Sequence, residues 1–249
     1  MTSKLFQDLM ESCTTDSPLF PPTLLYNEGW LLRIILAWYS SHEVKDHALF
    51  FSEGARWFSE ASLPSAFLPR FKGDRLAESH THLDGVMGHF VIGKTGKTDL
   101  SLLPDATQFV ALEAKIFSEL SYGVKKARYY DQAARNVACI TEVLRRANRH
   151  PGELQKLGFY VLAPQSQIEK KVFTRLMSRK SIRQKVERRV KEYVGDKDQW
   201  YSEWFQPTFQ YIKIRSISWE ELIEKITEQD GESGESIDGF YQRCLEFNL

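Results

Sequence analysis

Two acidic residues and one lysine lie at the ends of neighbouring segments that have the pattern of β-strands. Asp99 is the second residue of the segment 98–103, and Glu113 and Lys115 lie at the end of the segment 108–115. Residues two apart on a strand share one face, so Glu113 and Lys115 point the same way. Apolar residues precede both, which predicts two charges at the end of a buried strand. Two carboxylates and one ammonium that converge in this way suit metal-dependent hydrolysis of a phosphodiester.

The pairing of these two segments decides which carboxylates meet. If residues 104–108 form a five-residue loop, Asp99 lies opposite Glu113. If the loop has an even count, Asp99 faces Leu112 and a bulge is needed, and the sequence leaves this register open. Asp84, on the preceding strand, is the second choice to replace Asp99. The competing interpretation of the whole group is a salt bridge between strand ends, since cross-strand charge pairs are common.

The carboxylate oxygens of this group predict a site for a divalent cation. Asp99 and Glu113 are hard donors, and Mg²⁺, or Mn²⁺ in its place, prefers one or two carboxylates together with water and phosphate oxygens. Such a metal polarises the phosphate and lowers the pKa of a bound water. Lys115 would then hold the attacking water or stabilise charge that develops on the phosphorus.

The pattern of Asp99 followed by Glu113-Ala114-Lys115 as an E-x-K element resembles the PD-(D/E)XK nuclease superfamily. The resemblance implies a restriction-endonuclease-like αβββαβ core, here residues 26–163, and a DNA endonuclease of the restriction, defence or repair type. Many members add a glutamate on the first helix and a glutamine on the helix after E-x-K. Glu28 and Gln132 stand at those places, and the resemblance implies that both assist catalysis. Thr98 replaces the proline that often precedes the aspartate.

The elements that must position these residues follow from periodicity and turn signals. Helices are expected at 26–41, 53–61, 125–147, 167–194, 218–229 and 237–247. Strands are expected at 82–92, 98–103, 108–115, 157–163 and 209–214, the first three as an antiparallel meander. The chain is therefore predicted to be a single α/β domain, a mixed sheet flanked by helices, with 164–249 as an extension of the nuclease-like core.

Basic residues gather in the predicted extension. Residues 170–191 contain ten lysines and arginines against Glu187, although the whole chain has 33 basic and 33 acidic residues and no net charge. A basic helix with this excess would contact phosphates without reading sequence. The expected nucleic-acid contacts are Arg135, Lys170, Lys171, Arg175, Arg179, Lys180 and Arg183.

Other classes of protein are excluded or kept open by the same sequence. Apolar residues make up 42% of the 249, which excludes disordered and collagen-like chains, and the three scattered cysteines form no zinc or disulfide framework. The start of the chain lacks a signal-peptide pattern, and no apolar run is long enough for a membrane span, so a cytoplasmic protein is expected. Two alternatives remain: a catalytically inactive nucleic-acid-binding or scaffold protein of this fold, and an amidohydrolase-like enzyme that uses His80 and His82. A homodimer or a partner protein is possible.

Overall fold

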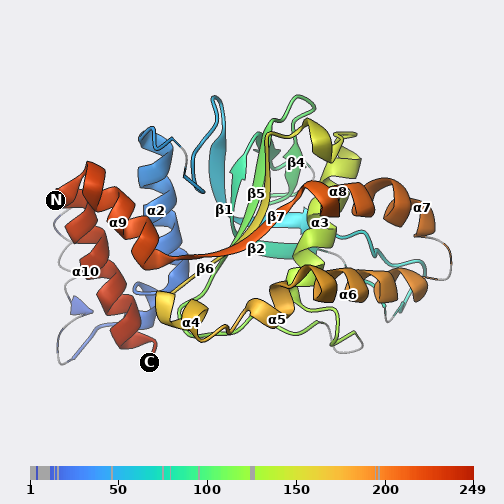
Figure 1. Cartoon of the computed structure of the whole chain (residues 1–249). Coiled ribbons are helices and arrows are strands. Elements are labelled where there is room, and N and C mark those ends of the chain that lie inside the picture. Colours follow the sequence, from blue (N-terminus) through green and yellow to red (C-terminus); the bar gives the residue numbers. More distant parts are fainter. Residues whose placement is uncertain are drawn as a thin grey trace.

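A five-stranded mixed sheet forms the centre of the molecule in the computed structural model (Figure 1). The structure describes residues 4, 12, 13, 15, 17–45, 47–74, 76–78, 80–94, 96–123, 127–193, 195 and 197–249. For His80 it describes the backbone and not the side chain. The strand order is β1-β2-β5-β6-β7. β2 pairs antiparallel with β1 and β5, whereas β6 pairs parallel with β5 and β7. The strands are β1 (Arg56–Pro64), β2 (His80–Gly88), β5 (Gln108–Ala114), β6 (Lys156–Ala163) and β7 (Lys213–Ser218).

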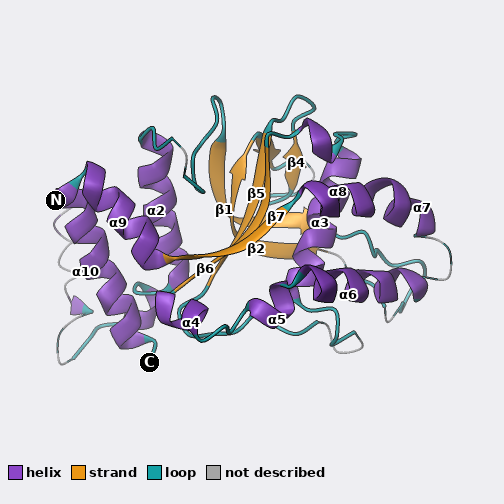
Figure 2. Ribbon diagram, viewed as in Figure 1, coloured by secondary structure: helices purple, strands orange, loops and turns teal. Residues whose placement is uncertain are grey.

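Helices cover both faces of this sheet, as Figure 2 shows. On one face lie α2 (Glu28–Ser41), α9 (Trp219–Gln229) and α10 (Gly231–Phe247). On the other lie α3 (Gln132–Arg146), α6 (Arg179–Lys191), α7 (Asp198–Trp200), the π-helical turn η3 (Tyr201–Phe205) and α8 (Gln206–Tyr211). Short turns complete the chain: η1 (Pro22–Leu24), η2 (Pro151–Glu153), α4 (Gln165–Glu169) and α5 (Thr174–Met177). In the described parts of the chain, no helix is long and apolar enough to cross a membrane.

The alternation of side chains along β5 produces two hydrophobic cores. Phe109 and Ala111 are buried against α3, whereas Val110 and Leu112 are buried against α2 and α9. Burial on both faces is what a continuous apolar run in a central strand predicts. By the same alternation Glu113 belongs to the α3 face, at the end of the strand.

The general α/β class with a mixed sheet between helices is confirmed, and so is the first helix at 26–41, but the expected helix at 53–61 is wrong. That segment enters β1, which pairs with β2 along its length. Trp57 and Phe58 favour a strand, and long-range pairing with β2 overrides the weak local helical pattern.

The expected meander is also wrong. The segment 82–92 breaks at Gly88, whose φ of 141° lies in the region open to glycine, and a Cβ there would lie 2.1 Å from the carbonyl oxygen of Gln108. After Gly88, β3 (Phe90–Ile92) pairs with β4 (Leu100–Leu102) in a separate two-stranded ribbon. β5 pairs with β2 and β6 instead of with the segment at 98–103.

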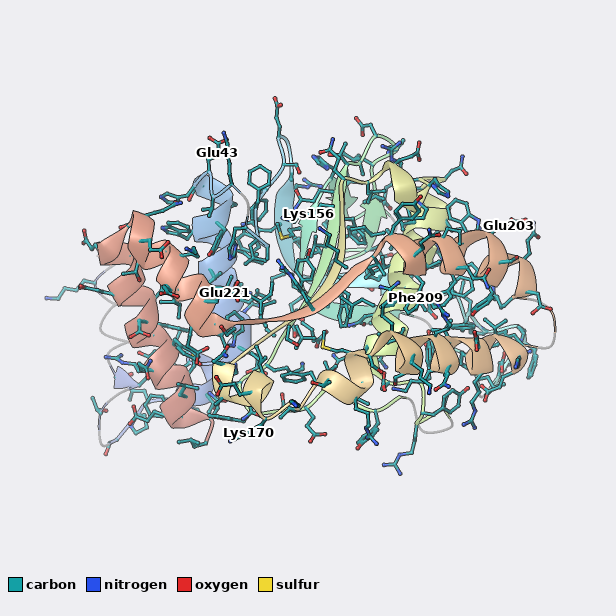
Figure 3. The ribbon with its side chains drawn as sticks, viewed as in Figure 1. Glu43, Lys156, Lys170, Glu203, Phe209 and Glu221 are labelled. Carbon is teal, nitrogen blue, oxygen red and sulfur yellow. The ribbon has the colours of Figure 1, made fainter. Side chains whose placement is uncertain are left out.

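Two expectations for the C-terminal third need correction. The basic segment 170–191 is not one helix, because Lys171 has a φ of 59° and Ser178 is extended, which separates α4, α5 and α6. The expected strand at 209–214 begins only at Lys213, and Phe209 belongs to α8. Phe209, labelled in Figure 3, packs against Arg179 and Arg183 of α6, so its apolar side chain serves a helix interface rather than a sheet.

Candidate active site

Three charged side chains meet where β5 ends beside β2. The ammonium of Lys115 lies 2.8 Å from Glu113 Oε1 and 3.7 Å from Asp84 Oδ2. The backbone of Lys115 is fixed on both sides, because its N–H donates to the Leu162 carbonyl at 2.8 Å and its carbonyl accepts from Trp219 Nε1 at 3.0 Å. Two carboxylates therefore share one cation at the edge of the sheet.

The Glu113 carboxylate is only 2% exposed and is held by the first turns of α3. Gln132 Nε2 donates to Glu113 Oε1, and Asn136 Nδ2 donates to Glu113 Oε2 at 3.1 Å. Gln132 and Asn136 are four residues apart and so lie on the same side of the helix. The side chain of Asp131 caps α3 by accepting from the Ala134 N–H, which starts the helix at Gln132.

Burial and charge determine the proton affinity of this group. Burial is the main cause that raises the pKa of Glu113 to about 8, and the charge of Asp84 raises it further, while Lys115 opposes the rise. Burial alone would lower the pKa of Lys115, but Glu113, Asp84 and, more weakly, Glu28 outweigh it and raise that pKa. The influence of Glu28 places the first residue of α2 within electrostatic reach of the lysine.

Asp84 is oriented by the backbone of β5 and by β1. Its Oδ2 accepts from the Ala114 N–H at 2.8 Å, and its carbonyl accepts from Ser59 Oγ at 3.1 Å. Ser59 pairs with Gly85 and Ala61 pairs with Leu83, so Glu60 lies opposite Asp84. Glu60 has a φ of 60°, a left-handed conformation that costs a non-glycine residue about 1–3 kcal/mol. The strand is therefore distorted at the position that faces the candidate site.

Asp99, the expected partner of Glu113, is not brought to it. It forms a parallel bridge with Ser62 of β1, and β2 separates β1 from β5. It lies in a turn where its N–H donates to the Gly96 carbonyl at 3.2 Å. The expectation was wrong because β4 pairs with β3, and the carboxylate that reaches Glu113 is Asp84, the second choice from the sequence.

The expected nucleic-acid contacts divide into two groups. Lys170, Lys171, Arg175, Arg179, Lys180 and Arg183 are all exposed. Lys170, labelled in Figure 3, and Lys171 follow the short helix α4. α4 comes directly after β6, and the end of β6 lies next to the end of β5, where the candidate site is. Arg135 differs, because it is half-buried and lowers the pKa of Glu78, against the larger effect of that carboxylate's burial. Its Nε atom is buried, which does not favour a phosphate contact.

The neighbours of the site include a second amide side chain of α3 and the histidines of β2. Asn136, one helical turn after Gln132, hydrogen-bonds Glu113. His82 is exposed on β2, while the side chain of His80 is outside the described residues, so the histidine-based alternative stays a prediction. Over the described part of the chain, no group of three or more histidine, cysteine, aspartate or glutamate side chains is arranged to hold a metal.

Comparisons with known proteins give no match. No protein-family model, no curated protein and no solved structure matches the sequence or the fold.

Proposed function

We propose that the protein is a metal-dependent nuclease that hydrolyses phosphodiester bonds of nucleic acid, with DNA as the first substrate to test. The observation that carries the proposal is the convergence of Asp84, Glu113 and Lys115 at the end of β5. The element order α2, β1, β2, β5, α3, β6 agrees with the αβββαβ order of the PD-(D/E)XK superfamily, once the β3–β4 ribbon is taken as an insertion. Asp84 takes the place first given to Asp99.

The residues present fit a divalent cation of the hard type. Asp84 and Glu113 offer carboxylate oxygens, which Mg²⁺ and Mn²⁺ prefer, and Asp84 remains 28% exposed toward solvent. Burial is the main cause of the raised pKa of Glu113, and the charge of the neighbouring Asp84 adds to it, so a further positive charge would favour the ionised carboxylate. When bound, the metal would polarise the phosphate and lower the pKa of a water molecule.

The protein's own side chains have separable tasks in this proposal. Lys115 supplies a positive charge that stabilises negative charge developing on the phosphate oxygens. Gln132 and Asn136 orient Glu113, and the Ala114 N–H orients Asp84. Glu113 and Asp84 do most to raise the pKa of Lys115, and Glu28 adds a weaker negative charge in the same direction. The exposed cations after β6 attract the phosphate backbone toward this edge of the sheet.

An inactive nucleic-acid-binding protein is the second candidate. The observation that favours it is the contact of Lys115 with both carboxylates, which is also how a purely structural ion cluster is arranged. Such a protein would bind DNA through the same exposed cations and would not cut it.

Cleavage of plasmid DNA by matched variants separates these functions. We expect the parent protein to nick or linearise supercoiled plasmid with Mg²⁺ or Mn²⁺ and not with EDTA. Asp84→Asn should reduce the rate by at least about 100-fold, because it removes a charged group that acts on the transition state. Asp99→Asn is the control and should stay within about twofold, because Asp99 lies beyond β1.

Each result bears directly on the proposal. Loss of cleavage in the Asp99 variant with full activity in the Asp84 variant would refute the site. Salt-sensitive DNA binding by the parent without cleavage under any metal would move the assignment to the binding protein.

A further inference from the structure

A cavity of about 570 Å³ opens beside the candidate site, between the start of α3 and the helices α5 and α6. Its size falls within the range of small-molecule sites in proteins, about 300–1,000 Å³. Two tyrosines and three cations are the chemically distinctive part of its lining. The described lining residues are Tyr122, Arg128, Tyr129, Asp131, Arg175, Leu176, Ser181 and Lys185.

The charges of the cavity favour an anion. The lining contains three cations, Arg128, Arg175 and Lys185, and one carboxylate, Asp131. That carboxylate is already engaged, since it caps α3 and forms an ion pair with Lys185. Arg128 and Arg175 are exposed, and their guanidinium groups are suited to a phosphate, which they can bind with two hydrogen bonds.

The aromatic rings of the cavity favour a flat partner. Tyr122 is 58% exposed, so much of its ring is open to a partner. Tyr129 forms a fixed wall, because the guanidinium of Arg188 lies 3.7 Å from the centre of its ring. An exposed tyrosine beside arginines is the arrangement on which unpaired bases stack while their phosphates are neutralised.

Hydrogen bonds connect this cavity to the candidate site. Ser121, which precedes Tyr122, donates its N–H to Gln132 Oε1 at 2.9 Å and accepts from the Gln132 N–H at 2.9 Å. Gln132 in turn donates to Glu113. Tyr122 is thus connected to Glu113 through its neighbour Ser121 and through Gln132.

From these observations we infer that the cavity binds one unpaired nucleotide of a nucleic-acid strand, the base on Tyr122 and the phosphate on Arg128 and Arg175. The inference rests on the proposed nuclease function in taking that strand as the substrate. It adds that the protein prefers a strand with an unpaired end or single-stranded segment over a fully paired duplex.

Binding in EDTA tests the cavity without cleavage. The probes are a fluorescent single-stranded 12-nucleotide DNA, the same sequence as a blunt duplex, and deoxyadenosine monophosphate as a competitor. We expect tighter binding of the single strand, and a loss of about tenfold in Tyr122→Ala, the size expected for one stacked base. Tyr122→Phe keeps the ring and should bind within about twofold of the parent. Arg175→Ala should weaken binding and flatten its salt dependence.

Two control variants test whether the loss of binding is specific to the cavity. Tyr211, 50% exposed on α8, and Lys213, exposed at the start of β7, give Ala variants that should bind like the parent. Equal binding by parent and Tyr122→Ala would overturn the inference, as would equal loss for duplex and single strand. Full competition by the mononucleotide at the strand's own affinity would also overturn it, since the ligand would then be a free nucleotide.

These results are independent of those for the proposed function. Binding that depends on Tyr122 in a protein that never cuts DNA would refute the nuclease and leave the cavity assignment standing. Metal-dependent cutting by a protein in which Tyr122→Ala and Arg175→Ala leave binding unchanged would support the nuclease and refute the cavity assignment.

Discussion

Replacing Glu113 by glutamine is the most informative single change to the site. The two side chains have nearly the same shape, so the buried space stays filled. Gln132 and Lys115 can still donate to the remaining Oε1. Asn136 Oδ1 is buried and has no hydrogen-bond partner among the described residues, so rotation of the Asn136 amide would let it accept from the new amide group. The Glu113→Gln variant should therefore fold.

The effect of this change on stability depends on pH, and its sign follows from the raised pKa. Glu113 titrates near 4.5 in the unfolded chain and, because of burial and the nearby Asp84, at about 8 in the folded protein. Below about pH 4.5 both states hold the proton, so the group does not contribute. Between the two values the folded protein keeps a proton that the unfolded chain releases, and stability falls as the pH rises. Above about pH 8 the loss is complete.

The magnitude is the free energy that corresponds to this difference in pKa. The two values differ by an amount equivalent to roughly 5 kcal/mol. Relaxation around the ionised carboxylate reduces it, so we expect Glu113→Gln to gain about 2–5 kcal/mol over the parent between about pH 5 and pH 8.5. Lys115 does not alter this slope, because its pKa is raised above 10.5 and it stays charged throughout the window.

Urea unfolding in EDTA, followed by circular dichroism at several pH values, measures the difference. Glu119→Gln is the control, because Glu119 is exposed and its replacement should leave stability unchanged within about 0.5 kcal/mol at every pH. A difference between parent and Glu113→Gln that stays constant from pH 5 to 8.5 would refute the argument that an ionised Glu113 is unfavourable here. Lower stability of the variant at high pH would refute it as well.

Three further predictions concern metal binding and charge. Millimolar Mg²⁺ or Mn²⁺ should raise the melting temperature of the parent and not of Asp84→Asn, measured by differential scanning fluorimetry, because a ligand of the folded state alone stabilises it. Lys115→Met should abolish plasmid cleavage but keep the native circular dichroism spectrum at pH 7, because Glu113, whose pKa is raised to about 8, holds a proton at that pH and leaves no ionised carboxylate buried without a counter-ion. Arg189 of α6 is fully buried beside Glu78, 3.4 Å away, so Arg189→Met should cost about 3–5 kcal/mol in urea unfolding, and adding Glu78→Gln should restore part of it.

The sequence predicted well those parts of the site that are set by local spacing. Glu113 and Lys115 share a strand face because they are two residues apart. Gln132 lies on the helix expected at 125–147, although that helix begins only at Gln132, where Asp131 caps it. Glu28 begins α2, where Asn27 caps the helix by accepting from the Trp30 N–H at 3.0 Å. Each of these depends on residues within one turn of each other, which is the range over which single-sequence rules hold.

The choice of Asp99 failed because it depended on which strands pair. Adjacent strands joined by a short turn usually pair, and this favoured a hairpin of 98–103 with 108–115. Two facts outside local range changed the result: the segment 53–61 is a strand, and Gly88 turns the chain away from β5. With 98–103 expected between the strands 82–92 and 108–115, no expected register carried Asp84 to Glu113, whereas in the structure β2 pairs directly with β5 and Gly85 lies opposite Leu112.

Charge counting was a poor guide to where the basic side chains point. The run 170–191 suggested a basic helix whose cations contact phosphates, yet Arg189 is buried with Glu78, and Lys185 is paired with Asp131. Arg179 and Arg183 stack on Phe209, 4.3 and 5.3 Å from its ring centre. A helix that packs on the protein must bury one side, and its sequence alone did not show that arginines occupy that side.

The charge balance at the end of β5 favours a cation site over a structural salt bridge. A salt bridge needs one carboxylate for each lysine, and the pair of Lys115 with Glu113 would be complete without Asp84. Instead Asp84 is held in place by the Ala114 N–H and by Ser59, although its charge makes the ionisation of Glu113 harder. The strand opposite is bent at Glu60 into a conformation that costs energy. An arrangement that opposes stability in two ways is expected where a further positive charge, such as a divalent metal, completes the site.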